Sequence, residues 1–414
     1  MVRVNLRDRA LALHRDNRGK IEVNGKVKIT NLNDLALAYT PGVAEPCRDI
    51  HADPEKVYEY TGKGNAVAVV TNGSAVLGLG NIGAKASLPV MEGKCVLFKS
   101  LAGVDAYPIA LDTEDPEAII TAVKLISPGF GGINLEDIKA PHCFQIEETL
   151  KNELEIPVFH DDQHGTAIVV LAGLINAVKL VGKRLEDCYT VINGAGAAGL
   201  AVTRLLLSLG VKQIRVCDIE GVLYPGSPQN SYPMREEIAA LTNPDGEQGL
   251  LNDVLAGADI FVGLSGAGVL DKRMVSRMAG DSIIMAMANP IPEIMPEEAL
   301  KGGARIVFTG RSDFPNQVNN VSAFPGVFRG ALDVRAREIN QEMKIAAADA
   351  IAGLIPEHEL SENNVIPSVM DHRVAPSIAK ATAEKALETG AARISVDPEK
   401  VYANALKLSA LPKE

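Results

Sequence analysis

The sequence IPVFHDDQHGTA, at residues 156–167, decides how this chain folds. A short apolar run ends in two adjacent carboxylates, Asp161 and Asp162, and Gly165 then opens a long apolar segment. This order predicts a strand, an acidic loop and a helix over residues 165–181. Ligands bind outside the C-terminal ends of parallel strands, where neighbouring loops leave a crevice. The stretch therefore predicts an α/β fold with acidic side chains at the ligand-binding edge of a sheet.

The same arrangement occurs upstream in GGINLEDIKAP, residues 131–141, where Glu136 and Asp137 follow an apolar strand. Residues 141–154 are expected to form the crossover helix that joins the two strands. Four carboxylates would then meet at one edge of one sheet. Because like charges at such a site repel or stay protonated, the pattern indicates a bound cation.

Carboxylate oxygens are hard ligands, which favours Mg²⁺ or Mn²⁺ at this edge. His160 and His164 flank the acidic pair and make zinc the alternative, but no cysteine or glutamate completes a tetrahedral set. A second alternative is that the aspartates only cap the helices that follow them. Capping explains a single residue more easily than it explains both acidic pairs.

Composition limits the class of protein. A chain of 414 residues is too long for one compact core, and we expect two domains. Hydrophobic residues make up 47% and charged residues 22%, which is typical of a globular protein. The net charge of -11 argues against non-specific nucleic-acid binding, which needs a basic surface.

Cysteine usage and hydropathy predict a cytoplasmic protein without a membrane partner. The cysteines are odd in number and widely spaced, which indicates neither a disulfide framework nor a zinc site: Cys47, Cys95, Cys143, Cys188 and Cys217. The N-terminal residues alternate charges and lack the apolar core of a signal peptide. The longest apolar span, after Gly165, is broken by Asn176 and Lys179, so we expect no membrane helix.

A βαβ rhythm begins at residue 65. Strands are expected at residues 65–71 and 108–111, helices at 87–101 and 116–126, and a glycine-rich turn, AVLGLGNIG, at 75–83. The first 60 residues are expected to be irregular, with Tyr39 just before a Thr-Pro-Gly turn. From residue 330 onward we expect mainly helices that fold back over the first domain.

The second unit opens with CYTVINGAGAAGLAVTRLLLSLG, residues 188–210. A strand at 189–193 meets glycines with GxGxxG spacing, a helix follows, and a strand at 213–217 ends at Asp218. A lone GxGxxG is weak evidence, but this full context predicts a Rossmann-type dinucleotide site. Its loop would hold the cofactor diphosphate at a helix N-terminus, with Gly194, Ala195, Gly196, Ala197, Ala198 and Gly199. The alternative is a glycine-rich turn used only for packing.

Asp218 favours NAD over NADP, because a carboxylate there can bond the ribose 2′-hydroxyl and repels a 2′-phosphate. Lys212 or Arg215 nearby would weaken that preference. Further strands are expected at residues 259–264, 282–288 and 305–309. Asn289 follows one of them, in MAMANPIP, and Asn320 lies in an amide-rich segment, DFPNQVNNVSAFPG.

A nicotinamide cofactor beside a divalent cation suggests oxidation of an anionic hydroxy acid, which needs a base for the hydroxyl proton. Lys94 lies among apolar neighbours, and burial next to a cation would lower its pKa enough to make it a usable base. Tyr39 can supply the proton for the enolate carbon. The alternatives are a solvated lysine and a tyrosine bonded to the backbone.

Seven motifs follow one another along the chain: LALAYTPGVAEPC, VLGLGNIG with PVMEGK, INLEDI, VFHDDQHGTA, INGAGAAG, MANP and VNNVSAFPG. This is the order found in malic enzymes, and the chain resembles the shorter bacterial kind over about residues 10–385. The resemblance implies metal-dependent oxidative decarboxylation of L-malate to pyruvate and CO₂, with NAD or NADP reduced. It also implies a homodimer.

By motif match, Tyr39 resembles the proton donor and Lys94 the general base of this family, with Asp161 assisting. The metal ligands implied are Glu136, Asp137 and Asp162, and Asn289 and Asn320 match amides that hold substrate and nicotinamide. Longer members have an arginine where Ala75 stands here, so Asn72, Ser74 and the same two asparagines become candidates for binding the second malate carboxylate.

We therefore predict an α/β chain of three parts. These are an N-terminal substrate and metal domain at residues 1–164, a Rossmann-type dinucleotide-binding domain at 165–385 and a helical tail at 386–414. Two rival functions remain open. One is a malolactic activity that retains NAD and releases lactate, and the other is a dinucleotide-binding regulatory protein without turnover.

Overall fold

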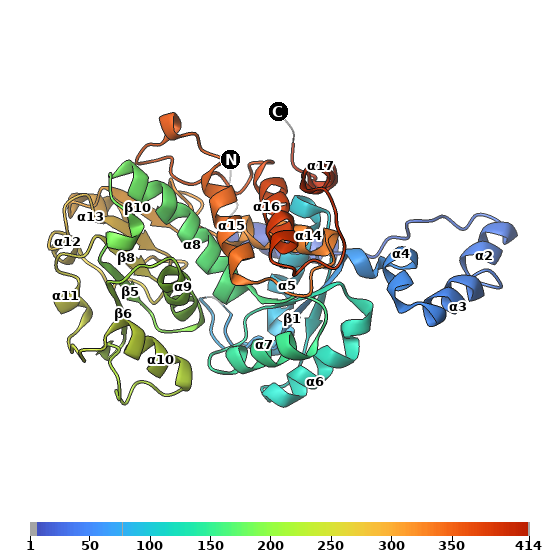
Figure 1. Ribbon diagram of the computed structural model, residues 1–414, viewed down its shortest axis with the longest axis horizontal. Helices are drawn as coiled ribbons and strands as arrows, with labels where there is room; N and C mark the ends of the chain where they lie inside the picture. The colour runs from blue at the N-terminus through green and yellow to red at the C-terminus, as the bar shows by residue number, and fades with distance from the viewer. Residues whose placement is uncertain (1–5, 77, 413–414) are drawn as a thin grey trace.

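The computed structural model describes residues 6–76 and 78–412 and has two sheets (Figure 1). The first has four parallel strands in the order β2-β1-β3-β4, and the second has six in the order β10-β9-β8-β5-β6-β7. The first sheet consists of β1 (Ala66–Thr71), β2 (Asp105–Ala110), β3 (Gly132–Leu135) and β4 (Val158–His160). The predicted α/β class, with a Rossmann-type second unit, is confirmed.

Helices cover both faces of the four-stranded sheet. Alternate residues of β1 face opposite ways, so Val67 and Val69 pack with α5 (Gly83–Ala102), which contributes Phe98. Ala68 and Val70 pack instead against α6 (Pro116–Ile126) and α7 (His142–Glu153). Because both faces are covered, β1 is a continuous apolar run.

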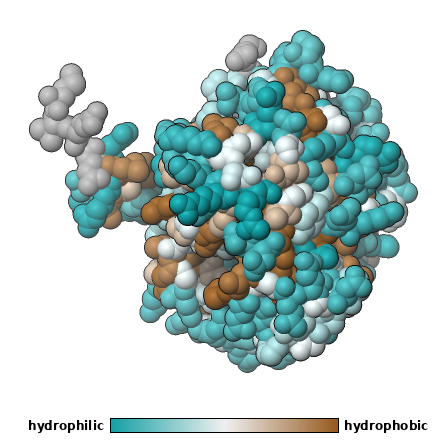
Figure 2. Space-filling model, turned by 90° about the vertical axis from the view of Figure 1, so that its left-hand side faces the viewer, coloured by the Kyte–Doolittle hydropathy of each residue, from teal (hydrophilic) through white to brown (hydrophobic). Residues whose placement is uncertain are grey.

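The six-stranded sheet forms the left part of Figure 1. Its strands are β5 (Thr190–Asn193), β6 (Ile214–Asp218), β7 (Gly221–Val222), β8 (Ile260–Gly263), β9 (Ile283–Ala286) and β10 (Ile306–Thr309). Its helices are α9 (Ala197–Ser208), α10 (Pro233–Thr242), α11 (Leu251–Val254), α12 (Lys272–Val275) and α13 (Pro296–Lys301). The chain passes from β5 to β6 on one side and later to β8 on the other, so the ligand crevice lies at the carboxyl ends of β5 and β8. The outer face near α12 and α13 is mainly hydrophilic, with separate hydrophobic patches (Figure 2).

The helix α8 (Asp161–Leu180) connects the two sheets and begins one turn earlier than predicted. The expected start at Gly165 is wrong because β4 passes directly into the helix, and acidic residues are favoured in a first helical turn. By length and composition α8 could cross a membrane, but 72% of its most apolar window is buried inside the protein. It is therefore a core helix here.

The C-terminal helices pack over the first sheet, as predicted. They are α14 (Phe324–Asp333), α15 (Gln341–Ala352), α16 (Val374–Glu388) and α17 (Pro398–Leu408). Helices α14, α16 and α17 contact α5, whereas α15 contacts α8. The division of the chain at residues 164 and 385 remains a prediction.

The N-terminal residues are helical, and the expectation of an irregular segment is wrong. The helices are α1 (Leu6–Asn17), α2 (Leu32–Ala38), α3 (Ala44–Ala52) and α4 (Val57–Tyr60). Figure 1 shows α2 and α3 on an arm that projects from the body. No residue of these two helices is buried, so they add nothing to the core of this chain.

Candidate active site

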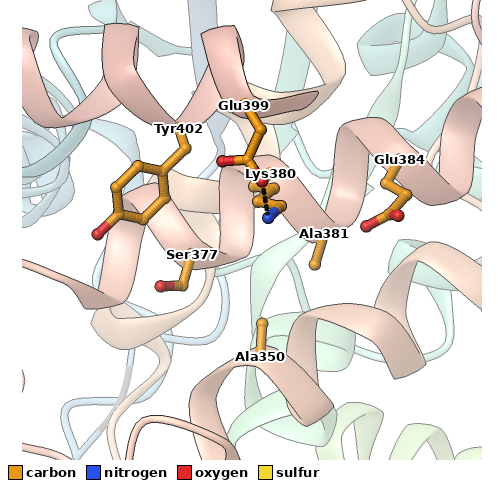
Figure 3. Close-up of a pocket in the computed structure, with 7 residues that line it drawn as sticks. All are labelled: Ala350, Ser377, Lys380, Ala381, Glu384, Glu399 and Tyr402. Atoms are coloured by element: carbon orange, nitrogen blue, oxygen red, sulfur yellow. Dashed lines mark hydrogen bonds and ion pairs between the residues drawn. The ribbon is translucent and has the colours of Figure 1, made fainter. Parts of the chain in front are cut away.

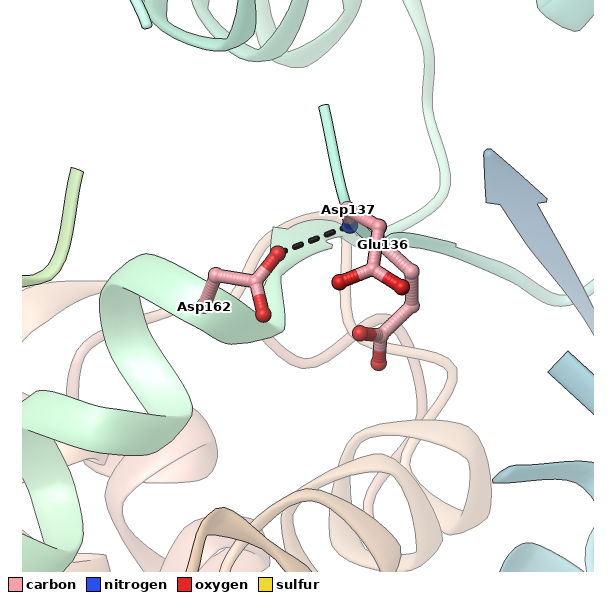
Figure 4. A group of neighbouring side chains, drawn as sticks. All are labelled: Glu136, Asp137 and Asp162. Carbon is pink, nitrogen blue, oxygen red and sulfur yellow. Dashed lines mark hydrogen bonds between the residues drawn. The ribbon is translucent and has the colours of Figure 1, made fainter. Parts of the chain in front are cut away.

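Three carboxylates lie together at the C-terminal edge of the four-stranded sheet (Figure 4). One oxygen each of Glu136, Asp137 and Asp162 lies within 4.8 Å of the other two. Glu136 and Asp137 follow β3, whereas Asp162 is in the first turn of α8, just after the neighbouring strand β4. The backbone N–H of Asp137 donates to Oδ2 of Asp162 over 2.8 Å. Asp137 has a left-handed backbone with φ of 53°, a strained conformation typical of functional sites.

The surroundings of this cluster fit a divalent cation. Glu136 is 1% exposed and Asp137 is 4% exposed, and Oδ2 of Asp137 has no hydrogen-bond partner among the described residues. Burial and the neighbouring carboxylates raise the pKa of Glu136 well above its ordinary value and that of Asp137 to about 8. A cation would satisfy the free oxygen and the buried charge, and a set of oxygens alone suits Mg²⁺ or Mn²⁺.

The capping alternative finds no support, and the zinc alternative is left with His160 alone, whose Nε2 lies 3.9 Å from Oδ2 of Asp162. His164 points away from the cluster, with Nε2 at 2.7 Å from Oε1 of Glu147 and Nδ1 at 3.0 Å from Nζ of Lys344. Among the described residues, the potential metal-binding group contains only carboxylates. Helices α8 and α7 have His160 and Pro141 as N-caps, and neither makes a side-chain capping bond. The acidic residues therefore do not act as N-caps.

Lys94, on α5, is buried against the carboxylates. Its Nζ lies 2.5 Å from Oδ2 of Asp161 and 3.1 Å from Oε1 of Glu136, and its side chain is 14% exposed. The solvated-lysine alternative is therefore wrong. Burial lowers the pKa of Lys94, but the charges of Asp161 and Glu136 outweigh it, so that the pKa is raised. The predicted lowering assumed a cation beside the amine, which would oppose the effect of these carboxylates.

Asp161 joins elements that are distant in the sequence. It is fully buried, and its Oδ2 also accepts a hydrogen bond of 2.6 Å from Nδ2 of Asn320. Gly165, one turn later, leaves room for this carboxylate, since a Cβ there would lie 1.8 Å from Oδ1 of Asp161. The glycine of HDDQHG is thus explained by the carboxylate it faces rather than by the start of a helix.

The GxGxxG loop has the predicted geometry. Gly194 has φ of 115°, and a Cβ there would lie 2.3 Å from the carbonyl oxygen of Leu264. A Cβ at Gly199 would lie 1.8 Å from the oxygen of Gly194, so helix α9 packs directly on the turn. A Cβ at Gly196 would meet open space, which is what a diphosphate needs to approach the backbone before α9. Ala195, Ala197 and Ala198 complete this loop.

Asp218 ends β6 as predicted, but its partner is a residue that the sequence did not reveal. Arg235, on α10 and 17 residues away, forms an ion pair with Asp218 and donates from Nε to the oxygen of Ala195 over 3.2 Å. Arg215 instead donates to Glu247 and to the oxygen of Thr242, away from Asp218. No local spacing indicates which arginine returns to a strand end.

Asn289 follows β9 and precedes Pro290 in a cis peptide bond. Gly78, which has φ of 74°, lies against it, because a Cβ there would be 3.1 Å from the oxygen of Asn289. The glycine-rich turn of the first unit thus meets a loop of the second; its Leu77 lies outside the described residues. Asn289 and Asn320 therefore approach the first unit at Gly78 and Asp161 respectively.

Tyr39, the predicted proton donor, does not lie near Lys94 and the carboxylate cluster of its own chain. It follows α2 on the projecting arm and is 66% exposed, whereas Lys94 is on α5 in the body (Figure 1).

Asn72 and Ser74, the candidates near Ala75 for binding the second malate carboxylate, already form hydrogen bonds within the protein. Oδ1 of Asn72 accepts from the N–H and hydroxyl of Ser74, whose Oγ accepts from the N–H of Lys139.

A depression between α15, α16 and α17 is separate from this site (Figure 3). It has a volume of about 370 Å³, and an ion pair between Lys380 and Glu399 crosses it. Figure 3 shows Tyr402 and Ser377 on its wall. None of its lining residues belongs to the carboxylate cluster or the dinucleotide loop.

Comparisons with known proteins agree with this geometry. Residues 18–151 match the family model "Malic enzyme, N-terminal domain", and residues 163–387 match "Malic enzyme, NAD binding domain". The bifunctional malic/malolactic enzyme of Bacillus subtilis is 62% identical, over 98% of this chain and 99% of its own length. The NAD-dependent malic enzyme of Geobacillus stearothermophilus is 56% identical, over 94% and 81%. The crystal structure of the Pyrococcus horikoshii malic enzyme superposes with a TM-score of 0.94 at 50% identity, over 98% and 96% of the two chains. The chain therefore belongs to the malic enzyme family.

Proposed function

We propose that this malic enzyme converts L-malate to pyruvate and CO₂, reduces NAD or NADP, and depends on Mg²⁺ or Mn²⁺. The observation that carries the proposal is the buried contact of Lys94 with Asp161 and Glu136 beside the three-carboxylate cluster. This cluster combines a candidate base with a candidate cation site. The first unit also meets the nucleotide-binding unit at Gly78 and Asn289.

Glu136, Asp137 and Asp162 would hold the cation, which would stabilise negative charge on the substrate oxygens. Lys94 would take the hydroxyl proton once a bound cation offsets the carboxylates that raise its pKa, and a bound nicotinamide would accept the hydride. Asp161 fixes the Lys94 amine and the Asn320 amide through one oxygen, and so sets their relative positions. Decarboxylation of the resulting keto acid leaves an enolate, which a proton from Tyr39 converts to pyruvate.

The arm supports a homodimer in which Tyr39 serves the site of a second copy. Tyr39 lies on the projecting arm next to α2, whose Leu32 and Leu37 are 83% and 70% exposed. Exposed apolar groups gathered on one segment are typical of an interface. A two-fold dimer would cover them and bring Tyr39 of each chain to the Lys94 of the other.

NAD is the proposed preference, with Arg235 as a moderating residue. Asp218 has the position that bonds a ribose 2′-hydroxyl, but Arg235 neutralises it and is 16% exposed at the side chain. The 2′-phosphate of NADP would therefore meet the guanidinium of Arg235 as well as the carboxylate of Asp218. The NAD-dependent relative from Geobacillus stearothermophilus supports the order NAD before NADP.

A malolactic activity is a second candidate, because the Bacillus subtilis relative is named a bifunctional malic/malolactic enzyme. In that reaction the bound cofactor would return the hydride to pyruvate retained at the site, and solvent would supply a proton. The sum is malate plus one proton to lactate plus CO₂, with NAD unchanged. The two activities differ in whether NADH accumulates.

We also propose a cytoplasmic location without membrane or nucleic-acid partners. All five cysteines are free thiols, as in proteins of reducing compartments. The net charge of -11 disfavours polyanion binding. The location would be tested by fractionating the source cells and measuring the amount of this enzyme in each fraction.

The test is a malate-dependent assay of nicotinamide reduction with NAD and with NADP, each with and without Mn²⁺. We expect reduction that requires Mn²⁺, with pyruvate as product, and its loss in Asp162→Asn. Absence of metal-dependent reduction with either cofactor would contradict the proposed function. Lactate formed without NADH accumulation would favour the malolactic activity instead.

A further inference from the structure

Glu293 is a fully buried carboxylate behind the Asn289 loop, and no step proposed above uses it. It lies four residues after Asn289, in the segment NPIPE that follows β9. Such a group needs hydrogen-bond donors, because burial of an unpaired carboxylate is costly. Its donors therefore indicate what the carboxylate is for.

The two carboxylate oxygens bind the loops that follow two neighbouring strands. Oε1 accepts from the backbone N–H of Ser265, after β8, over 2.9 Å, and lies 3.4 Å from the Ser265 hydroxyl. Oε2 accepts from the N–H of Ala288, after β9, over 2.9 Å. The Ser265 hydroxyl accepts in turn from Nδ2 of Asn193, the last residue of β5, over 2.7 Å. One side chain thus connects the carboxyl ends of β8 and β9 directly and reaches β5 through Ser265.

The chain also makes room for this carboxylate. Gly263 ends β8, and a Cβ there would lie 2.5 Å from Cδ of Glu293. The backbone oxygen of Glu293 accepts from the N–H of Leu270, so the loop is held on its main chain as well. Any larger residue than glycine at position 263 would displace the carboxylate from its two donors.

We propose that Glu293 is a positioning residue that sets the place of Asn289 relative to the dinucleotide-binding loop. The carboxylate binds the N–H of Ala288, the residue immediately before Asn289, and its other oxygen is tied to the crevice between β5 and β8. Transfer of a hydride depends on alignment to within about 1 Å, so release of this loop would slow the reaction more than it weakens cofactor binding. The inference rests on the proposed role of Asn289 in holding substrate and nicotinamide.

The experiment is a double-mutant cycle on the full chain with Glu293→Gln, Asn289→Ala and the double variant. Glutamine has nearly the same shape, but its NH₂ group would face one of the two backbone N–H donors. We expect kcat for malate to fall at least about tenfold in each single variant, and the double variant to be no slower than Asn289→Ala. The Kd for NADH, measured by fluorescence, should change less than about threefold, because the diphosphate loop is untouched.

Glu298→Gln is the matched control, because Glu298 is an exposed residue of α13 paired with Lys301, and it should keep the wild-type kcat. The inference would be overturned if the kcat of the double variant fell by the product of the single effects, or if Glu293→Gln kept the wild-type kcat. Either result would leave the proposed function intact. A wild-type kcat in Asn289→Ala would refute the proposed role of Asn289 and the inference with it. If Glu293→Gln does not fold, Gly263→Ala displaces the same carboxylate and is carried through the same cycle.

Discussion

Lys94, Asp161 and Glu136 form a buried charge cluster whose members depend on one another. Removing one partner of a buried ion pair costs about 3–5 kcal/mol, because the other charge is left uncompensated. The bond from Asp161 to Lys94 and the bond to Asn320 share one oxygen, Oδ2. At the scale of single residues, activity and stability are therefore coupled at Lys94.

We predict that Lys94→Ala loses malate oxidation by at least about a hundredfold in kcat, because the hydroxyl proton has no acceptor. NADH and Mn²⁺ should still bind, since their candidate ligands are retained. The matched control is Lys99→Ala on the same helix, where the lysine is exposed and pairs with Asp105. Turnover near the wild-type rate in Lys94→Ala would exclude Lys94 as the base.

The carboxylate cluster predicts a pH-dependent metal affinity. Burial raises the pKa of Asp137 to about 8, and the pKa of Glu136 also lies above its ordinary value. A cation binds the ionised carboxylates and releases their protons, so the Kd for Mn²⁺ should fall as the pH rises toward 8. Calorimetric titration in two buffers of different ionisation enthalpy would count the released protons. A pH-independent Kd would contradict the prediction.

Substitutions of Asp218 and of Arg235 should change the preference between NAD and NADP in opposite directions. Asp218→Ser should raise kcat/KM for NADP, because it removes a repelling charge, and Arg235→Ala should lower it. The wild type is expected to prefer NAD, and a preference for NADP would refute that expectation. Arg204→Ala is the control, because Arg204 pairs with Glu237 on the exposed surface.

At the scale of elements, the first turn of α8 has a polar network on the side away from the metal cluster. Glu147 of α7 is 2.7 Å from His164 and accepts from Gln163 over 3.0 Å, and Lys344 of α15 reaches the other nitrogen of His164. The turn that carries Asp161 and Asp162 is thereby tied to two other helices. Lys344 is only 7% exposed in this network.

Lys344 should make stability depend on pH. Burial, with a smaller contribution from Lys151, lowers its pKa to about 7, whereas the unfolded chain has the ordinary value of 10.5. Between these values the unfolded state binds more protons, so this lysine makes the protein more stable as the pH rises from 7 toward 10. The melting temperature of Lys344→Met, measured relative to the wild type, should therefore be highest near pH 7 and fall toward pH 10.

The control for this measurement is Lys179→Met, an exposed position of α8, for which the difference in melting temperature should be constant with pH. Loss of the bond to His164 lowers the stability of Lys344→Met at every pH and does not alter the trend. A difference between Lys344→Met and the wild type that is the same at pH 7 and pH 10 would contradict the assignment.

At the scale of the whole molecule, the arm separates Tyr39 from the other site residues of its own chain (Figure 1). Helices α2 and α3 contribute nothing to the buried core, so their apolar residues gain stability only by contact with another surface. A site completed by a second copy would make activity depend on assembly.

Mixed dimers test this arrangement. Tyr39→Phe and Lys94→Ala should each be inactive alone, but a refolded mixture should regain about a quarter of the wild-type activity, because half of the dimers then contain one intact site of two. Size-exclusion chromatography with light scattering would confirm the dimer. No recovery in verified mixed dimers would show that Tyr39 does not act across the interface.

Much of the fold follows from local patterns. The helix α6 has the predicted bounds, and every predicted strand of both sheets is present within a few residues. The cause is that apolar runs, GxGxxG and strand-end acids each depend on neighbours close in sequence. The same holds for the meeting of Glu136, Asp137 and Asp162, since parallel strands must end at one edge.

Other features depend on contacts between distant residues. Lys94 and Asp161 are 67 residues apart, and Asp161 and Asn320 are 159 apart. The pKa of Lys94, the partner of Asp218 and the bond from Ser265 to Glu293 all follow from such contacts. The sequence therefore determined the two sheets, the cofactor loop and the acidic edge through local chemistry. The tertiary structure decided which charges meet and which residue stands apart, because burial and electrostatic pairing depend on distance in space.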